Sequence, residues 1–491
     1  MKVIVGSSLR LVGAPPNVID RMRAVLTFDN PDYRNRTARG LPTWGVPKKI
    51  KLYEEDGAVV PRGALPLVRE AARLAKRPIT WESCVTKHKS VDPGEPMDGL
   101  RAYQREAVER LVQAVQGYVV IPCGGGKTFI GSAAIESTGE SACVVGPTKD
   151  IVDQWFNTLA QHGMNPVKPG FVKRPMRPGD VAVGTPQSFH RSTGGERALE
   201  SCGVIVFDEC HRVAAPSWKS LTERCPARYR FGLTATPSRS DGLEFMIDYL
   251  IGPRVHTVTP DELVDDGFLV RPDIVVVESS WSHKTPPDFG EEGNQHWTWD
   301  GDRFRFQWVR AVSAAAHSHA RNGVILNLGL AAAKDQRSTL ILVPRVNGAY
   351  KIRDLLRRHG VNVEAVSGQS GVGERRGKIA DLRSGELQVL VATQLADEGL
   401  DVPALDCLIN AIPGKADRGT LQRVGRLMRP SGRPPILFDL ADGGVVFAKH
   451  ARTRMSAYRK ALNASPVGPV PLNKALEMFP GQELSRVAVT L

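Results

Sequence analysis

A glycine-rich loop in the first third of the chain has the residue types that hold nucleotide phosphates. Residues 122–128 read Pro-Cys-Gly-Gly-Gly-Lys-Thr, between an apolar run at 117–121 and a helix-compatible stretch from Phe129. A strand, a glycine loop and a helix in this order wrap phosphate groups, because successive backbone N–H groups point into the loop. Lys127 can then reach the β- and γ-phosphates, and the Thr128 hydroxyl can ligate Mg²⁺. The alternative is a surface glycine turn that happens to precede Lys-Thr.

Two neighbouring carboxylates follow about eighty residues later, at the end of a second apolar run. Residues 204–207 read Val-Ile-Val-Phe and lead directly into Asp208 and Glu209. Ligands of open α/β sheets bind at the carboxyl ends of the strands, so this run would deliver both carboxylates to such an edge. We expect Asp208 to hold Mg²⁺ through water, and Glu209 to activate the attacking water as a general base. A strand that ends in an exposed Asp-Glu pair is the alternative, and the glycine loop at this spacing argues against it.

Further short motifs accompany the loop and the carboxylates. In chain order the series is 100–104 (Leu-Arg-Ala-Tyr-Gln), 122–128, 146–148 with Gln154-Trp155, 183–187, 208–211 (Asp-Glu-Cys-His), 233–237 (Leu-Thr-Ala-Thr-Pro), 392–403 and 422–429. This series resembles the ordered motifs of the superfamily-two helicases and translocases, and most of all those of the XPB and UvsW branch. The resemblance covers roughly residues 95–445. One departure is Arg239-Ser240-Asp241, where XPB relatives carry Arg-Glu-Asp.

The resemblance implies a role for each matching residue. Catalysis is expected of Glu209, Lys127, Arg426 and Arg429, the two arginines acting as arginine fingers on ATP. ATP-binding residues are expected to be Gln104, which would read adenine, the loop residues Pro122, Cys123, Gly124, Gly125, Gly126, Lys127 and Thr128, and Asp208, Gly399, Asp401 and Arg423. The expected Mg²⁺ ligands are Thr128 and Asp208. Contacts with the nucleic-acid backbone are expected at Pro147, Thr148, Gly184, Thr185, Ser367, Gly368 and Thr393, through groups that ignore base identity.

The function that these roles imply is an ATP-dependent DNA helicase or translocase. The family implies 3′-to-5′ movement, Mg²⁺ as the metal, and duplex, forked or branched DNA as the substrate in repair, recombination or replication. An RNA helicase is one alternative, although DEAD-box RNA enzymes usually show Ser-Ala-Thr where this chain has Thr234-Ala235-Thr236. An ATP-gated clamp or sensor that binds duplexes without translocating is another. No convincing nuclease constellation is present, which disfavours a cleaving restriction subunit.

Charge and composition favour a polyanionic partner and exclude a membrane protein. The net charge is +13, and residues 1–90 carry 17 Lys or Arg against 8 Asp or Glu, which gives +9 of that total. No apolar run approaches the ~18–20 residues that span a bilayer. The first ten residues are too short and too charged for a signal peptide. Seven scattered cysteines without zinc spacing indicate reduced thiols. We therefore expect a cytoplasmic or nucleoid-associated monomer.

The alternation of strands and helices predicts an α/β fold of two parallel-sheet lobes behind a small α+β accessory domain, and the resemblance implies that these lobes are RecA-like. The expected domains are a basic, nucleic-acid-binding accessory domain (1–95), an ATP-binding lobe one (96–255), lobe two (256–445) and a C-terminal basic helix and tail (446–491). Strands are expected at 2–5, 26–28 and 50–53, at 119–121, 142–145, 181–183, 204–207 and 230–233, and at 274–277, 339–343, 363–366, 389–391, 407–412 and 435–440.

Lobe two is expected to carry an aromatic insertion at about 281–308. Residues 295–308 alternate on both sides of Asp300-Gly301, which predicts a hairpin with its turn at that pair. The hairpin would either pack its aromatic face onto lobe two or meet the duplex as a pin. The stretch 447–462 predicts a basic helix, which is either a solvated surface or a nucleic-acid contact.

Overall fold

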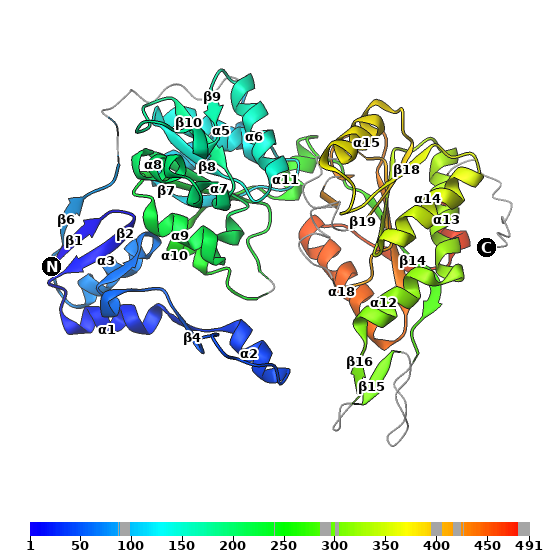
Figure 1. Cartoon of the computed structure of the whole chain (residues 1–491), viewed down its shortest axis with the longest axis horizontal. Coiled ribbons are helices and arrows are strands. Elements are labelled where there is room, and N and C mark those ends of the chain that lie inside the picture. The colour runs from blue at the N-terminus through cyan, green and yellow to red at the C-terminus, as the bar shows by residue number, and fades with distance from the viewer. Residues whose placement is uncertain are drawn as a thin grey trace. The chain divides into compact units, whose positions relative to one another are not determined.

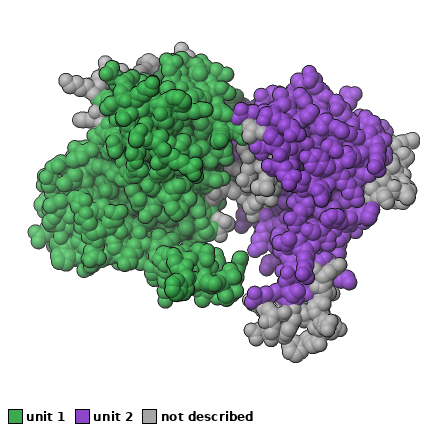
Figure 2. Space-filling model, viewed as in Figure 1, with its two compact units in different colours: residues 1–122, 126–258 green, residues 123–125, 259–491 purple. Residues whose placement is uncertain are grey.

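The chain folds into two compact α/β units. The computed structural model describes residues 1–86, 88, 99–239, 241–284, 296–299, 304–393, 405–415, 424–425 and 427–479. Unit 1 comprises residues 1–122 and 126–258, and unit 2 comprises residues 123–125 and 259–491 (Figure 2). Unit 1 thus contains the accessory domain together with almost all of lobe one.

The accessory domain is a small four-stranded sheet with two helices. The strand order is β5-β2-β1-β6, with β1 antiparallel to β2 and parallel to β6. In β2, Leu9 and Leu11 are buried while Arg10 and Val12 are exposed, the two-residue period of a half-buried strand. The elements are β1 (Lys2–Val5), β2 (Ser8–Val12), α1 (Pro16–Val25), η1 (Glu55–Gly57), β5 (Val59–Pro61), η2 (Arg62–Ala64), α3 (Leu65–Leu74) and β6 (Thr80–Ser83).

An arm, residues 27–51, projects from the accessory domain (Figure 1). Its stalk is the antiparallel ladder of β3 (Thr27–Asp29) and β4 (Lys49–Lys51), and α2 (Pro31–Ala38) follows β3. No residue of α2 is buried. The arm is therefore a surface element that adds nothing to the core beyond its stalk.

Lobe one is built on a seven-stranded parallel sheet of order β13-β7-β12-β11-β8-β10-β9. Its central strands are buried along their whole length, as strands covered by helices on both faces must be. The strands are β7 (Gln116–Val120), β8 (Ala142–Val145), β9 (Asn165–Val167), β10 (Asp180–Gly184), β11 (Val204–Asp208), β12 (Tyr229–Thr234) and β13 (Arg254–Thr257). The helices are α4 (Ala102–Ala114), α5 (Lys127–Thr138), α6 (Lys149–Gln161), η3 (Pro169–Phe171), α7 (Pro186–His190), α8 (Thr193–Ser201), η4 (Cys210–Ala214), α9 (Pro216–Arg224) and α10 (Met246–Leu250).

Lobe two repeats this architecture with the strand order β18-β19-β17-β20-β21-β14-β22, again all parallel. The strands are β14 (Asp273–Ser282), β17 (Thr339–Val343), β18 (Val363–Val366), β19 (Val389–Thr393), β20 (Cys407–Asn410), β21 (Ile436–Gly443) and β22 (Val467–Val470). The helices are α11 (Pro260–Asp265), α12 (Trp308–His317), α13 (His319–Lys334), α14 (Val346–Arg358), α15 (Val372–Ser384), α18 (Val445–Leu462) and α19 (Leu472–Leu476). The expected fold class, two RecA-like lobes with a small accessory domain, is confirmed.

The accessory domain and lobe one share one continuous core. Val3, Leu9 and Met22 belong to the same buried cluster as Phe207 and Leu250. A covalent linker alone would not require this packing. The accessory domain is therefore a fixed part of unit 1 and not a tethered module.

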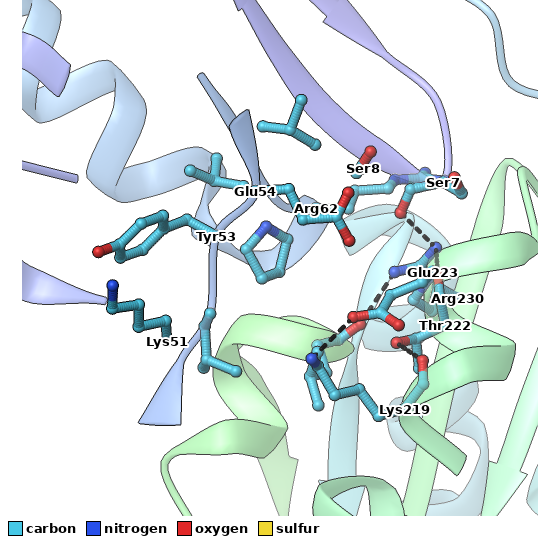
Figure 3. Close-up of a pocket in the computed structure, with 15 residues that line it drawn as sticks. Ser7, Ser8, Lys51, Tyr53, Glu54, Arg62, Lys219, Thr222, Glu223 and Arg230 are labelled. Carbon is cyan, nitrogen blue, oxygen red and sulfur yellow. Dashed lines mark hydrogen bonds and ion pairs between the residues drawn. The ribbon is translucent and has the colours of Figure 1, made fainter. Parts of the chain in front are cut away.

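A fully buried arginine reinforces this joint. The Arg230 guanidinium donates to the carbonyl of Ser7 at 3.1 Å, of Thr222 at 3.0 Å and of Leu250 at 2.9 Å. Burial lowers the pKa of Arg230 to about 10. Beside it, residues of both domains line a cavity of about 90 Å³ (Figure 3). Arg62 lines the same cavity and donates to the carbonyls of Ala227 and Arg228.

The aromatic hairpin of lobe two packs inward at the residues whose side chains are described. Its strands are β15 (Trp297–Trp299) and β16 (Phe304–Phe306), and its expected turn at 300–301 lies outside the described residues. Trp297 and Phe306 are cross-strand partners with ring centroids 5.0 Å apart. Phe306 also contacts Phe447 of α18, at 5.9 Å between centroids. These contacts match the packing interpretation of the hairpin.

The C-terminal helix α18 is not uniformly a solvated basic surface. Arg454 is buried and pairs with the fully buried Asp439, with Nε 2.8 Å from Oδ2. Beyond α18, β22 joins the edge of the lobe-two sheet beside β14. Among the described residues, no helix is both long and apolar enough to cross a membrane.

Candidate nucleotide site

Three of the sequence motifs meet at one edge of the lobe-one sheet. Strand β12 lies between β7 and β11, with Thr234 opposite Val120 and Leu233 opposite Asp208. All three strands are parallel and end within about one residue of each other. The glycine loop after β7, the carboxylates after β11 and the threonines after β12 therefore share the edge where α/β sheets bind ligands.

The glycine loop has the backbone that a phosphate cradle needs. Gly126 is the N-cap of α5 and has a φ of +79°, in the left-handed region that favours glycine. The N–H groups of the first turn of α5, at the positive end of the helix dipole, give this loop the electrostatics of an anion site. Lys127 and Thr128 are the first two residues of the helix, and both are partly buried.

Gln104 lies directly against this loop. A Cβ atom at Gly126 would stand 2.5 Å from Gln104 Nε2, so the loop approaches Gln104 as closely as glycine allows. The Oε1 of Gln104 accepts the backbone N–H of Arg101 at 3.0 Å and so caps α4. The expected adenine-reading residue is thus buried, fixed by its own helix and in contact with the phosphate loop.

The cation and the two carboxylates stand together beside the loop. Lys127 Nζ is 3.7 Å from Glu209 Oε1, and both side chains are largely buried. Burial and the charge of Glu209 raise the pKa of Asp208 to about 6. Burial also opposes ionisation of Glu209, but Lys127 and His211 outweigh it and lower the pKa of Glu209 to about 2. Glu209 is therefore ionised at neutral pH. A cation beside Asp208 would stabilise the ionised form of that carboxylate, which burial and Glu209 disfavour.

Trp155 fixes the orientation of the Asp208 carboxylate. The sequence analysis assigned no role in the site to Trp155. The Trp155 indole N–H on α6 donates to Asp208 Oδ2 at 2.9 Å, and the Glu209 backbone N–H donates to Oδ1 at 2.9 Å. Trp155 is fully buried. The only signal in the sequence was its place beside Gln154 in the 146–155 motif. Nothing local linked it to a carboxylate 53 residues away.

A hydrogen-bond path joins the carboxylate motif to the threonine motif. His211 is buried, and its Nδ1 lies 3.0 Å from Thr234 Oγ1 and 3.3 Å from Glu209 Oε2. Thr234 Oγ1 also accepts the backbone N–H of Thr236 at 3.3 Å. A change at Glu209 thus has a direct route, through two buried side chains, into the backbone after β12.

Arg239 extends the path to the segment that departs from the family pattern. Its guanidinium forms two hydrogen bonds to Asp241, of which Nε to Oδ1 is 2.8 Å, and it also donates to the carbonyl of His211. These bonds to Arg239 lower the pKa of Asp241. Ser240 between them lies outside the described residues. Arg239 and Asp241 therefore act as one clamp on the carboxylate motif.

The expected nucleic-acid residues of lobe one sit at strand ends and helix starts. Thr148 is the N-cap of α6, and its Oγ1 accepts the N–H of Ile151 at 3.4 Å. Thr185 is the N-cap of α7 without a side-chain cap bond, so its hydroxyl is not used by its own helix. Pro147 is partly buried, whereas Gly184 is buried. Ser188 and Pro169 pack so closely on Gly184 that a Cβ atom there would clash with both.

The expected residues of lobe two are only partly described. Ser367 is fully buried, and its Oγ accepts the N–H of Gln369 at 3.2 Å, whereas Gly368 is exposed. Thr393, at the end of β19, is buried, and its Oγ1 has no hydrogen-bond partner among the described residues. Arg429 is partly buried. Four expected site residues lie outside the described part: Gly399, Asp401, Arg423 and Arg426.

The residues of lobe one fit ATP and Mg²⁺. The glycine loop, in which Gly124 and Gly126 have positive φ angles, and the Lys127 ammonium group suit phosphate oxygens. The pKa of Asp208 is raised, and a nearby cation would stabilise its ionised form. Among the described residues no three His, Cys, Asp or Glu side chains gather to hold a metal ion. The expected pair of one hydroxyl (Thr128) and one carboxylate (Asp208) suits Mg²⁺, which binds through one or two protein ligands, substrate phosphates and water.

Comparison with known protein families agrees with this geometry. The family model described as "Type III restriction enzyme, res subunit" matches residues 98–239, and the model described as "Helicase conserved C-terminal domain" matches residues 321–431. The Rad25 protein of Halobacterium salinarum is 29% identical over 394 residues, which are 76% of this chain and 60% of that protein. The DNA 3′-5′ helicase XPB of Mycobacterium tuberculosis is 27% identical over 374 residues, 73% of this chain and 62% of that protein.

The fold has solved counterparts as well. The fragment structure of a type I restriction enzyme HsdR subunit from Vibrio vulnificus superposes with a TM-score of 0.56 at 18% identity. The superposition covers 79% of this chain and 72% of that one. It shows the fold alone. In its two matched domains and its relatives, this chain resembles the superfamily-two helicases, and among them the XPB branch. The chain spans about 60% of the length of the two relatives named above.

Proposed function

We propose that this chain is an ATP-dependent DNA helicase or translocase that moves 3′ to 5′ and unwinds or remodels duplex, forked or branched DNA. The observation that carries the proposal is the shared edge of lobe one, where Lys127 lies 3.7 Å from Glu209 and beside Asp208. Relatives named as DNA 3′-5′ helicases and translocases supply the substrate and the direction. DNA is the proposed partner, RNA is disfavoured, and the protein acts as a monomer in the cytoplasm or nucleoid.

Each residue of the lobe-one edge has a chemical task in this proposal. Bound Mg²⁺ would neutralise charge on the β- and γ-phosphates, with Thr128 and Asp208 as its protein ligands. Lys127 exchanges its contact with Glu209 for phosphate oxygens, which frees the Glu209 carboxylate. Because Lys127 is the main group that lowers the pKa of Glu209, loss of that contact makes the carboxylate a better proton acceptor, and it can then orient a water and accept its proton. Trp155 keeps Asp208 in one orientation throughout.

Lobe two supplies the remaining charge in the proposal. Arg426 and Arg429 act as arginine fingers, and Gly399, Asp401 and Arg423 complete the nucleotide contacts, as the family resemblance implies. Gln104, Pro122 and Cys123 remain proposed ATP contacts on lobe one, together with the three glycines of the loop.

Coupling between ATP and DNA is proposed to use the path through His211 and Thr234. DNA-backbone contacts are proposed at Pro147, Thr148, Gly184, Thr185, Ser367, Gly368 and Thr393. Ser367 and Thr393, the buried residues of this set that carry a hydroxyl, would bind DNA after a local rearrangement or through their backbone N–H groups. The accessory domain, with its excess positive charge, is proposed to contribute to the choice of DNA structure.

The first test is whether nucleic acid stimulates ATP hydrolysis. We expect DNA to raise the ATPase rate of the full chain, and its affinity to fall steeply with salt because binding to phosphates releases counterions. Stimulation by RNA alone would favour the RNA-helicase alternative. No stimulation by either polymer would refute the proposed function.

A further inference from the structure

We propose that the arm, residues 27–51, binds DNA beside a fork and that Trp44, in the turn formed by residues 43–46, stacks on an unpaired base. The inference rests on the proposed function, because it names how part of the DNA is held. It does not involve the nucleotide site. The observations that carry it are the exposure of Trp44, the turn that presents it, the anchoring of the arm and its charge.

Trp44 is far more exposed than folding alone accounts for. Its side chain is 96% exposed, whereas Trp81 and Trp308, the other strongly exposed tryptophans of the described residues, are at 43% and 37%. A tryptophan buries up to roughly 250 Å² when it is covered, and this apolar surface is a cost in water. Tryptophan is enriched where proteins meet partners, because its large ring has an apolar face and a polar N–H.

A tight turn places Trp44 at a corner of the arm. The N–H of Val46 donates to the carbonyl of Thr43 at 3.0 Å, which closes a four-residue turn. Gly45, the third residue, has a φ of +73°, as a type II turn requires at this position. Trp44 is therefore the second residue of the turn and has turn residues on both sides.

The arm is held in shape and attached to lobe one. Strands β3 and β4 form its stalk. Just beyond the ladder, Asn30 Nδ2 donates to the carbonyl of Pro47 at 2.8 Å and joins the two chain segments again. At the base, the Phe28 ring packs on Phe245 at 4.0 Å and on Tyr249 at 5.9 Å between centroids. A ring carried on such an anchored element is presented at little cost in chain entropy.

The charge of the arm fits a polyanion. Residues 27–51 contain six Lys or Arg and two Asp, a net charge of +4. Both aspartates are already paired, Asp32 with Arg36 at 2.9 Å and Asp29 with Lys49 at 2.6 Å. The remaining basic side chains, which form no ion pair with any described carboxylate, are Arg34, Arg39, Lys48 and Lys51. Cations and an exposed aromatic ring on one element are a combination that binds a single strand, because cations attract phosphates and a ring can stack on a base.

The test compares arm variants on forked and blunt DNA. Fluorescence anisotropy would give the dissociation constants of fluorescein-labelled forked and blunt duplexes for the full-length wild type, Trp44→Ala and Trp44→Phe. We expect Trp44→Ala to weaken fork binding about 5- to 150-fold, the loss of one stacked base, and to change blunt-duplex binding less than about threefold. Trp44→Phe should retain most of the affinity. Trp81→Ala, in the same domain, is the matched control and should bind both DNAs as the wild type does.

Two further readouts separate stacking from charge and from misfolding. Arg34→Gln with Arg39→Gln should weaken both DNAs and lower the slope of log affinity against log salt by about one for each phosphate that is no longer neutralised. A 2-aminopurine base at the fork junction should lose fluorescence on adding wild type and much less on adding Trp44→Ala. Basal ATPase activity and the thermal midpoint should be unchanged in every arm variant.

Each outcome decides a different part of the inference. If wild type binds forks and Trp44→Ala binds them equally well, the arm inference is wrong and the proposed function stands. Equal losses on fork and blunt duplex would contradict stacking on an unpaired base. If wild type neither binds DNA nor is stimulated by it, the proposed function fails and the arm inference fails with it.

Discussion

The indole N–H of Trp155 donates to Oδ2 of Asp208 at 2.9 Å, inside the core of lobe one. This bond fixes the orientation of a carboxylate whose pKa is raised to about 6 by burial and by Glu209. A hydrogen bond to an ionised carboxylate favours the ionised form, so the bond from Trp155 opposes the rise in the pKa of Asp208. Residues that orient metal ligands in this way contribute strongly to metal affinity.

The first prediction removes this bond alone. Trp155→Phe keeps an aromatic ring in the core but leaves Oδ2 of Asp208 without its donor. We expect the Mg²⁺ concentration for half-maximal ATPase activity to rise about 10- to 100-fold. Trp218→Phe is the matched control, because Trp218 is a buried ring that packs on Phe207 of the same strand as Asp208. An unchanged Mg²⁺ requirement in Trp155→Phe would show that Asp208 needs no such support.

The second prediction separates Lys127 from Glu209. Lys127→Ala should abolish ATP hydrolysis and weaken ATP binding, because the phosphates lose a positioned cation. Glu209→Gln should leave ATP bound but lower kcat by at least about 100-fold, since only the proton acceptor is removed. Binding of a fluorescent ATP analogue and steady-state hydrolysis would be measured on both variants. Near wild-type hydrolysis by Glu209→Gln would refute its assignment as the general base.

The third prediction concerns the clamp of Arg239 on the carboxylate motif. Arg239→Gln removes the donor to the His211 carbonyl and the two hydrogen bonds to Asp241. We expect basal ATP hydrolysis to fall less than about threefold and the stimulation by DNA to fall at least about tenfold, because coupling and not chemistry is disturbed. ATPase rates with and without a saturating duplex would be compared. Equal decreases in both rates would instead indicate a role in the nucleotide site itself.

The fourth prediction concerns the joint between the accessory domain and lobe one. Arg230→Met should lower the free energy of unfolding by about 3 kcal/mol or more, because several buried carbonyls lose their donor. Arg228→Met is the control, since the Arg228 side chain is exposed. Chemical denaturation of the full chain gives both values. By the same reasoning, deletion of residues 1–95 should destabilise lobe one, since it removes part of a shared core. If Arg230→Met unfolded with the same free energy as the wild type, the hydrogen bonds of Arg230 would not stabilise the joint between the two domains.

Sequence patterns located the lobes well because buried parallel strands are continuous apolar runs. Strands expected at 142–145, 339–343 and 363–366 match β8, β17 and β18 residue for residue. Strand β22 gave no such signal, because its four residues include a proline. An edge strand tolerates proline, and this strand lies at the edge of its sheet.

The site was less predictable than the sheets, for a physical reason. The spacing within a motif identified Lys127, Asp208 and Glu209, since neighbouring residues share one loop or strand end. Trp155 reaches Asp208 only through the tertiary fold, and no local pattern encodes a contact across 53 positions. Charge was also an incomplete guide, because Arg454 counts as basic surface in the sequence but forms a buried pair with Asp439.

The most direct test of the central claim is displacement of streptavidin from biotinylated DNA. The account predicts that the full-length protein with ATP and Mg²⁺ strips streptavidin from the 5′ end of a single-stranded oligonucleotide much faster than from its 3′ end, as a motor moving 3′ to 5′ must. Glu209→Gln should strip neither end. DNA-stimulated ATP hydrolysis without displacement from either end would contradict translocation along single-stranded DNA. If a biotinylated duplex also kept its streptavidin, the protein would be an ATP-gated clamp.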